Sequence, residues 1–208
     1  MNPTILVNRR AALRGFFRRP VRAAATVALV VALGGCGAYD YAADVFSKPL
    51  VLPCPKSWVV ADAANLTQFR EGTGRDLIDI DYDGEITGIE LGCVTNADKK
   101  TLVGTMDVEV QILVNATRGP ANRDRKGKFG YFVSVTDKDL KVLYREAFSL
   151  AVDFPGNRTR LLVRSRPVTL QIPIQPKKSS DYFRVFAGFT LSHEQLEFNR
   201  KRQQNVPK

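Results

Sequence analysis

Hydrophobic and polar residues alternate with a period of two over most of the chain after Phe69. The clearest stretch is residues 101–114. One parity there holds Leu102, Met106, Val108, Val110, Ile112 and Val114, while the other holds Thr105, Asp107, Glu109 and Gln111. Such alternation places one face of a strand on a core and the other in water. It predicts a half-buried strand over residues 101–114.

Further strands are expected in five segments with the same alternation, at residues 129–135, 142–150, 160–163, 168–174 and 183–191. Pro167 separates two of them, because proline cannot donate to a central ladder. Seven or eight short strands without alternating helices predict an all-β fold, an antiparallel β-sandwich of the immunoglobulin or fibronectin type. A closed β-barrel is the alternative.

Two short helices are expected beside these strands. Residues 58–69 show a pattern that a short helix can hold, although Asn65 and Thr67 weaken it. Ser192 and Gln195 have the spacing of a capping box, with serine at the cap and glutamine three residues later. This spacing predicts a C-terminal helix through about Arg200, followed by a basic tail at residues 201–208.

An acidic segment at residues 79–90 supports two interpretations. Its acidic side chains resemble the calcium loop of EF-hands in spacing, with the candidate ligands at Asp79, Asp81, Asp83 and Glu90 and glycine at the sixth position. The flanking glycines do not suit the helices that an EF-hand needs. Asp83-Gly84 is also a strong two-residue turn signal. We therefore favour a β-hairpin about Asp83-Gly84 and expect no tight metal site.

The first 35 residues differ from the rest of the chain. They carry six arginines and no acidic residue, and residues 23–33 are uncharged and apolar apart from Thr26. Eleven helical residues span only about 17 Å, which is too short for a hydrocarbon core of about 30 Å. A basic head, a short apolar run and small residues together predict a secretory signal.

The end of this segment, Leu33-Gly34-Gly35-Cys36, resembles the lipobox of bacterial lipoproteins. That resemblance implies a signal peptide at residues 1–35, an acylated Cys36 and a lipidated tether at residues 36–53 before a β-sandwich domain at residues 54–200. Gly37, rather than aspartate, follows the cysteine, which implies sorting to the outer membrane, facing the periplasm. An ordinary signal peptide with a chance cysteine and an uncleaved helical anchor are the alternatives.

Several motifs in the remaining chain also carry a resemblance. They are Cys54-Pro55, Gly74-Arg75-Asp76-Leu77, Arg118-Gly119-Pro120-Ala121, the run at residues 131–137, Gly188-Phe189 and Glu194-Gln195-Leu196. On these motifs the chain is similar to a group of small alphaproteobacterial lipoproteins of unassigned function. The resemblance implies a compartment but names no activity and no catalytic residue.

On this interpretation the three cysteines have two different roles. Cys36 takes the lipid, which leaves Cys54 and Cys93 in an oxidising compartment where disulfides persist. We expect the two to be bonded. Two free thiols are the alternative, and metal ligation is weaker, because neither cysteine has a second ligand at the usual spacing.

Charge is concentrated at the leader and at one connection. The chain has a formal net charge of +10, but more than half of it lies in the leader. A nucleic-acid-binding protein needs its positive charge on the folded domain, so we expect no nucleic-acid partner. The connection at residues 118–128 is a candidate anion or partner site, unless it is only a solvated loop. Its basic residues are Arg118, Arg123, Arg125, Lys126 and Lys128.

Catalytic motifs are missing from the sequence. It has no G-x-S-x-G elbow, no phosphate-binding loop and only one histidine, His193. We therefore expect no enzyme activity and no cofactor. The sequence favours a lipid-anchored envelope protein that binds or scaffolds an envelope protein or polymer, with the membrane reached through Cys36. An envelope hydrolase and a calcium-stabilised module that uses residues 79–90 are the alternatives.

Overall fold

The computed structural model describes residues 50–204. The expected signal peptide at residues 1–35, Cys36 and most of the tether lie outside the described residues. Residues 50–204 belong to one compact unit. Within it the elements are β1 (Lys56–Val59), η1 (Ala61–Ala63), β2 (Asn65–Phe69), η2 (Leu77–Asp79), β3 (Ile80–Ala97), β4 (Gly104–Arg118), β5 (Lys126–Thr136), β6 (Val142–Asp153), β7 (Arg160–Arg164), β8 (Val168–Ile174), η3 (Ser180–Tyr182), β9 (Arg184–Phe189) and α3 (His193–Gln204).

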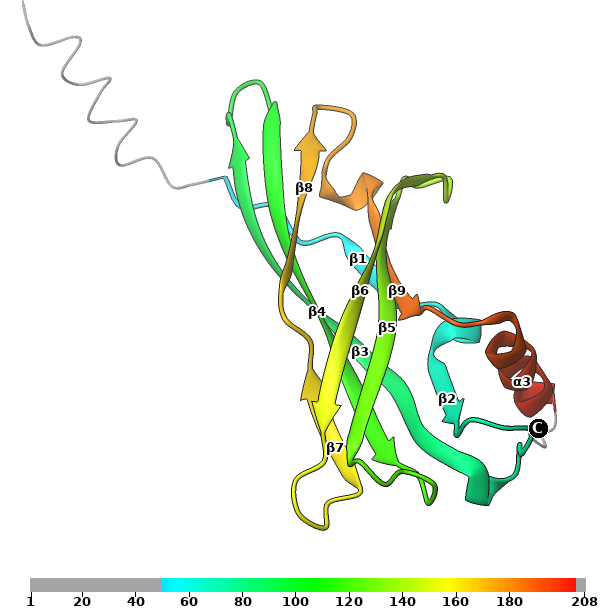
Figure 1. Ribbon diagram of the computed structural model, residues 1–208. Helices are drawn as coiled ribbons and strands as arrows, with labels where there is room; N and C mark the ends of the chain where they lie inside the picture. The colour runs from blue at the N-terminus through cyan, green and yellow to red at the C-terminus, as the bar shows by residue number, and fades with distance from the viewer. Residues whose placement is uncertain (1–49, 205–208) are drawn as a thin grey trace, which may run out of the picture. The chain divides into compact units, whose positions relative to one another are not determined.

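The strands form two sheets (Figure 1). The four-stranded sheet has the order β1-β9-β5-β6, and the five-stranded sheet has the order β2-β3-β4-β7, with β8 also paired to β4. All pairs are antiparallel except β1 and β9. The sheets do not join into a closed barrel, so the β-sandwich is confirmed. No helix within residues 50–204 is long and apolar enough to cross a membrane.

The core lies between the two sheets and follows the alternation in the sequence. Strand β4 contributes six side chains that are at most 1% exposed: Met106, Val108, Val110, Ile112, Val114 and Ala116. Strand β5 contributes Phe129, Tyr131, Val133 and Val135, all buried. Leu102 has the same parity as the buried residues of β4 but is exposed, because β4 begins only at Gly104.

The break at Pro167 is confirmed. Strands β7 and β8 pair with successive parts of the same edge of β4, at Leu113–Thr117 and at Gly104–Val110. Ser165 occupies the break and continues the pairing. Its amide donates to the carbonyl of Ile112 (2.9 Å), and its hydroxyl accepts from the amide of Ile112 (3.0 Å).

The expected helix at residues 58–69 is wrong. That segment forms β1, the single turn η1 and β2. Strand β1 pairs in parallel with β9, and β2 pairs with β3 from Asn65 to Phe69. Asn65 and Thr67, the residues that weakened the helix prediction, both lie in β2. Pairing with partners distant in sequence therefore decided the conformation here, as often happens for strands.

The expected hairpin about Asp83-Gly84 is also wrong. Both residues lie inside β3, an 18-residue strand with partners on both sides. Gly84 pairs with Leu66 of β2 and with Ala116 of β4. A Cβ atom at Gly84 would lie 2.5 Å from a ring carbon of Phe129. Glycine is needed there because a core aromatic ring packs against the backbone, not because the chain turns.

This contact leads to a stability prediction. Gly84→Ala should lower the free energy of unfolding by about 1–3 kcal/mol, because overpacking forces rings or backbone to shift. Gly92→Ala is the matched control in the same strand, since its added methyl would meet only Glu109 at an ordinary 3.8 Å. Urea unfolding of the two variants measures the difference. Equal stability of the two would contradict the packing role assigned to Gly84.

The C-terminal helix begins with the expected capping box. The Ser192 amide donates to Gln195 Oε1 (2.9 Å), and the Gln195 amide donates to Ser192 Oγ (3.2 Å). The helix continues past Arg200 to Gln204, so residues 201–204 are helical and not the start of a loose tail. Buried Asn199 fastens the helix by donating to the carbonyls of Asp62 and Asn65, at 3.2 and 2.7 Å.

The expected disulfide is confirmed. Cys54 and Cys93 are bonded, with their Cα atoms 5.7 Å apart. The bond joins the segment before β1, which belongs to one sheet, to β3, which belongs to the other. Leu52 lies beside it, packed on the core, with its amide donating to Thr95 Oγ1 (3.4 Å). The last residues of the expected tether therefore already belong to the folded unit.

Candidate functional site

A large cleft lies along one open side of the sandwich, between β6 of one sheet and β8 of the other. Its volume is about 770 Å³. Its lining includes apolar and aromatic side chains from β5, β6, β8, η3 and the residue after η3, namely Val135, Leu143, Leu170, Ile172, Tyr182 and Phe183. Most of these are buried core residues, so the floor of the cleft is the core itself.

Both strands that border this cleft are edge strands. Within residues 50–204, β6 pairs only with β5, and β8 pairs only with β4. Every side chain from Val142 to Ala147 is exposed, although four of the six are apolar or aromatic. Leu143 is 51% exposed and Tyr144 is 38% exposed. An edge strand of this kind presents unpaired backbone groups that can accept another strand.

The rim of the cleft carries two lysines and one carboxylate, and the carboxylate is engaged in hydrogen bonds. Lys141 and Lys178 both line it. The carboxylate of Asp137 is buried and accepts from the amides of Asp139 and Lys141, each at 2.9 Å, so it holds the β5–β6 turn. The hydroxyl of Tyr144 donates to Glu146, and this hydrogen bond raises the pKa of the Tyr144 hydroxyl.

The basic connection is shorter than expected, since β4 runs to Arg118 and β5 begins at Lys126. Its four outermost cations, Arg123, Arg125, Lys126 and Lys128, are exposed. None of the ion pairs found in residues 50–204 includes them. They surround a turn held by buried Asn122, whose amide donates to Asp81 (2.8 Å) and to the carbonyl of Lys126 (2.7 Å). A role of these cations in binding stays a prediction.

The candidate calcium ligands do not curl around a common point. Asp79 ends η2, and the other three are distributed along the extended strand β3. Asp79 is 4% exposed and is paired with Arg70 (2.6 Å), whereas Glu90 is paired with Arg164 (2.8 Å). Burial raises the pKa of the Asp81 carboxyl, which accepts from Asn122. In the part of the chain that is described, no three acidic, histidine or cysteine side chains are grouped to hold a metal.

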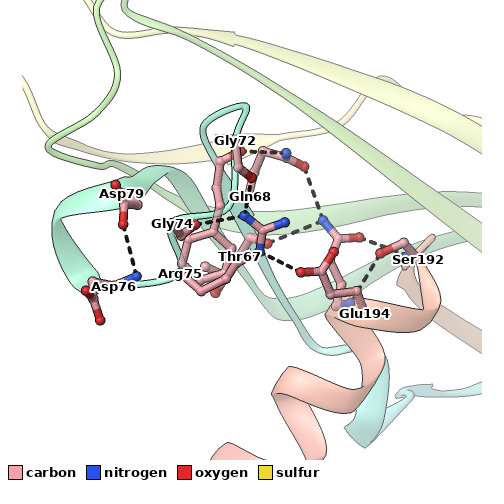
Figure 2. Close-up of polar contacts among 11 residues, drawn as sticks. Thr67, Gln68, Gly72, Gly74, Arg75, Asp76, Asp79, Ser192 and Glu194 are labelled. Carbon is pink, nitrogen blue, oxygen red and sulfur yellow. Dashed lines mark hydrogen bonds and ion pairs between the residues drawn. The ribbon is translucent and has the colours of Figure 1, made fainter.

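Two of the motifs noted in the sequence meet at the helix. Figure 2 shows the side chain of Arg75 directed at Glu194 at the start of α3, with an Nε–Oε1 distance of 2.5 Å. Arg75 also donates to the carbonyls of Gly72 (2.9 Å) and Gly74 (2.7 Å). The hydrogen bond from Arg75 lowers the pKa of the Glu194 carboxyl. Because its donors are engaged in this way, Arg75 serves to fasten α3 to the loop before η2.

Two glycines of these motifs, Gly74 and Gly119, are required by close packing. A Cβ atom at Gly74 would lie 2.3 Å from the Asp79 carboxylate, and one at Gly119 would lie 2.1 Å from the carbonyl oxygen of Ile80. His193 lies on α3 with a highly exposed side chain that pairs with Glu197 (3.2 Å). The motifs therefore describe how the domain is held together.

The sequence did not indicate the cleft. Its residues come from four separate segments, and most of them look like ordinary core positions. One local signal existed: Val142-Leu143-Tyr144 interrupts the alternation with three consecutive apolar or aromatic residues. Successive side chains of a strand point to opposite faces, and an antiparallel sheet commonly has one face in water. Three consecutive apolar residues therefore place at least one apolar side chain on that face.

No protein-family model matches the chain, and no curated protein matches it. Among solved structures it is similar to the variable (V) domain of the Streptococcus agalactiae AgI/II polypeptide BspA, at 13% identity over 62% of this chain and 73% of that chain. The TM-score of 0.16 is too low to indicate a shared fold or function. The resemblance to alphaproteobacterial lipoproteins stays a prediction.

Proposed function

We propose that the protein is a lipid-anchored component of the bacterial cell envelope that binds an extended polypeptide segment of a partner protein. The bound segment lies in the cleft between β6 and β8. One observation carries this proposal: two edge strands, one from each sheet, border a single apolar cleft. The anchor is the lipid on Cys36, and the compartment is the one implied by the lipobox.

The backbone of an extended peptide can form hydrogen bonds with the edge strands of this site. A strand added to β6 or to β8 pairs its amides and carbonyls with an edge that has no partner within residues 50–204. Alternate side chains of the added strand then point toward the cleft floor, where Leu170, Ile172 and Phe183 lie. The remaining side chains point outward, so the segment needs apolar residues at every second position.

The rim adds a preference in charge. Lys141 and Lys178 line the cleft, while the carboxylate of Asp137 is engaged by its own turn. Acidic residues at the outward positions of the peptide would therefore meet two lysines with little opposing charge. Complementary charge of this kind improves selectivity and association rate more than affinity.

A peptide-binding experiment tests the proposal. The probe is a fluorescent eight-residue peptide in which valine alternates with threonine and glutamate, titrated into the domain of residues 50–208. Leu143→Asp should weaken binding at least tenfold, because burial of a leucine side chain contributes about 1.5–3 kcal/mol. Leu162→Asp is the matched control, since Leu162 is exposed on β7 and does not line the cleft.

Two further measurements separate strand addition from simple apolar contact. Peptide binding should slow hydrogen exchange in β6 or β8, and methylation of alternate peptide amides should abolish binding. The proposal is overturned if the peptide does not bind, or if Leu143→Asp and Leu162→Asp bind it equally. It is also overturned if sedimentation shows that β6 is occupied by a second copy of the domain.

A further inference from the structure

One end of the sandwich gathers the start of the folded unit and three turns (Figure 1). The register establishes this arrangement. Gly104 at the start of β4 pairs with Ile174 at the end of β8, which brings together the β3–β4 turn and the segment after β8. Arg184 at the start of β9 pairs with both Thr136 and Lys56, which brings the β5–β6 turn and the start of β1 to the same end.

The β3–β4 turn at this end is held rigidly by one carboxylate. Asp98 Oδ1 accepts from the amides of Lys100 (3.0 Å) and Thr101 (2.7 Å), and from the hydroxyl of Thr101 (2.9 Å). The backbone of Asp98 also bonds both ways across the turn, accepting from the amide of Leu102 (2.8 Å) and donating to the carbonyl of Val103 (3.0 Å). The turn therefore has a fixed shape.

That fixed shape displays an apolar side chain. Leu102 has a φ of 54°, in the left-handed region that disfavours residues other than glycine, asparagine and aspartate. The β5–β6 turn at the same end repeats the pattern, with Asp137 accepting from backbone amides and Leu140 at a φ of 64°. Leucine is strained in this conformation, and strained residues cluster at functional sites.

Exposed apolar side chains lie on the β3–β4 turn, on β3 before it and at the start of the folded unit. Val51 is 80% exposed, Val94 62%, Val103 54% and Leu102 38%. Lys99 and Lys100 are exposed beside them, whereas the one acidic residue of the turn, Asp98, is engaged by the backbone. We call these six residues the tip patch: Val51, Val94, Lys99, Lys100, Leu102 and Val103. Leu102 and Val103 belong to the rigid turn, Val94 lies near the end of β3, and Val51 is adjacent to Leu52, which is held to β3 at Thr95. Single exposed apolar residues are ordinary, but several at one end of a domain mark an interaction surface.

We infer that the tip patch contacts the lipid surface to which the protein is anchored, with its apolar side chains in the interface and its lysines at anionic headgroups. This inference rests on the proposed lipid anchor at Cys36. The Leu52 amide donates to Thr95 Oγ1 (3.4 Å), which holds the start of the folded unit against the β3–β4 hairpin. Cys36 precedes Leu50 by 14 residues. A chain of that length reaches at most about 50 Å, so the anchor holds this end of the domain within that distance of the bilayer.

The side chains of the tip patch are of the kind that binds a lipid surface. Amphipathic surfaces with lysine and apolar side chains bind at the boundary between headgroups and acyl chains. Anionic lipids attract the lysines, and the attraction falls off within a Debye length of the surface. The exposed cations at residues 123–128 do not belong to the tip patch, because the β4–β5 connection lies at the opposite end of β4 and β5.

Vesicle sedimentation tests the inference on the domain of residues 50–208, which contains the described core and the disulfide but lacks Cys36. The vesicles are phosphatidylethanolamine with phosphatidylglycerol at a ratio of 3:1, compared with phosphatidylcholine alone. Leu102→Ser/Val103→Ser should lower the partition coefficient on the anionic vesicles at least tenfold. Lys99→Gln/Lys100→Gln should lower it severalfold on the anionic vesicles only.

Matched controls lie at the other end of the domain. Arg158→Gln/Arg160→Gln removes two exposed charges beside the end of β4, where Arg160 pairs with Thr117, and should leave the partition coefficient unchanged. Thermal unfolding verifies that each variant is folded. The inference is overturned if the domain does not bind anionic vesicles, or if the tip and control variants bind them equally. Because this domain carries no lipid, failure here leaves lipidation of Cys36 and peptide binding at Leu143, each measured separately, unaffected.

Discussion

Reduction of the Cys54–Cys93 disulfide is expected to lower the free energy of unfolding by about 4 kcal/mol. The bond closes a loop of 39 residues, and in the chain-entropy model a loop of that size removes this much conformational freedom from the unfolded state. The folded state should change little, because Leu52 and β3 also contact the core near the bond. A loss of about 4 kcal/mol is a large share of the 5–15 kcal/mol that is typical of a domain.

Urea unfolding of the domain of residues 50–208, with and without a reductant, measures this difference. The matched control is Cys54→Ala/Cys93→Ala, which should have the stability of the reduced protein and should not respond to the reductant. A reductant effect that persists in the double variant would mean that the loss has another source. An oxidised protein as unstable as the double variant would contradict the prediction.

The six strands expected from residue 101 onward are all present, and the clearest of them are those whose alternation is long and uninterrupted. Strand β4 buries one parity, as the sequence indicates, whereas β5 buries both parities from Tyr131 to Thr136. Residues 168–174 were equally clear, because Leu170, Ile172 and Ile174 alternate with polar residues and proline. A period of two is a local property of a strand with one face on the core, so a single sequence reveals it.

The errors arose where a local signal was opposed by distant contacts. Asp83-Gly84 is a turn dipeptide, yet β2 and β4 pair with it on both sides and Phe129 packs on Gly84. Neither partner is near it in sequence. The same holds for Leu102, whose parity predicted burial, because the turn that begins at Asp98 ends the alternation before Gly104.

The candidate site was beyond local patterns for a related reason. The cleft exists because β6 and β8, which are not hydrogen-bonded to each other, end the two sheets on the same side. Ile172 and Phe183 have the same appearance in the sequence whether they are covered by another strand or form a cleft floor. The disulfide was predictable, in contrast, because only two cysteines remain after Cys36.

Replacement of the lipobox cysteine, Cys36→Ser, is expected to remove nearly all of the protein from the membrane fraction or to leave it as an uncleaved precursor. Each methylene of a buried acyl chain contributes about 0.8 kcal/mol, so acylation is the largest contribution to membrane binding that this chain has available. The apolar run at residues 23–33 is too short to replace it. The tip patch alone should provide only weak, reversible binding.

Detergent-phase partitioning and the mass of the mature N-terminus measure this effect in cells. The wild-type chain should enter the detergent phase and begin at an acylated Cys36. Two controls separate the anchor from the rest of the molecule: Cys54→Ala/Cys93→Ala should still be acylated, and Leu102→Ser/Val103→Ser should still enter the detergent phase. If the Cys36→Ser protein matures normally and stays in the membrane fraction, the lipobox interpretation is wrong, and the anchor must be sought in the apolar run instead.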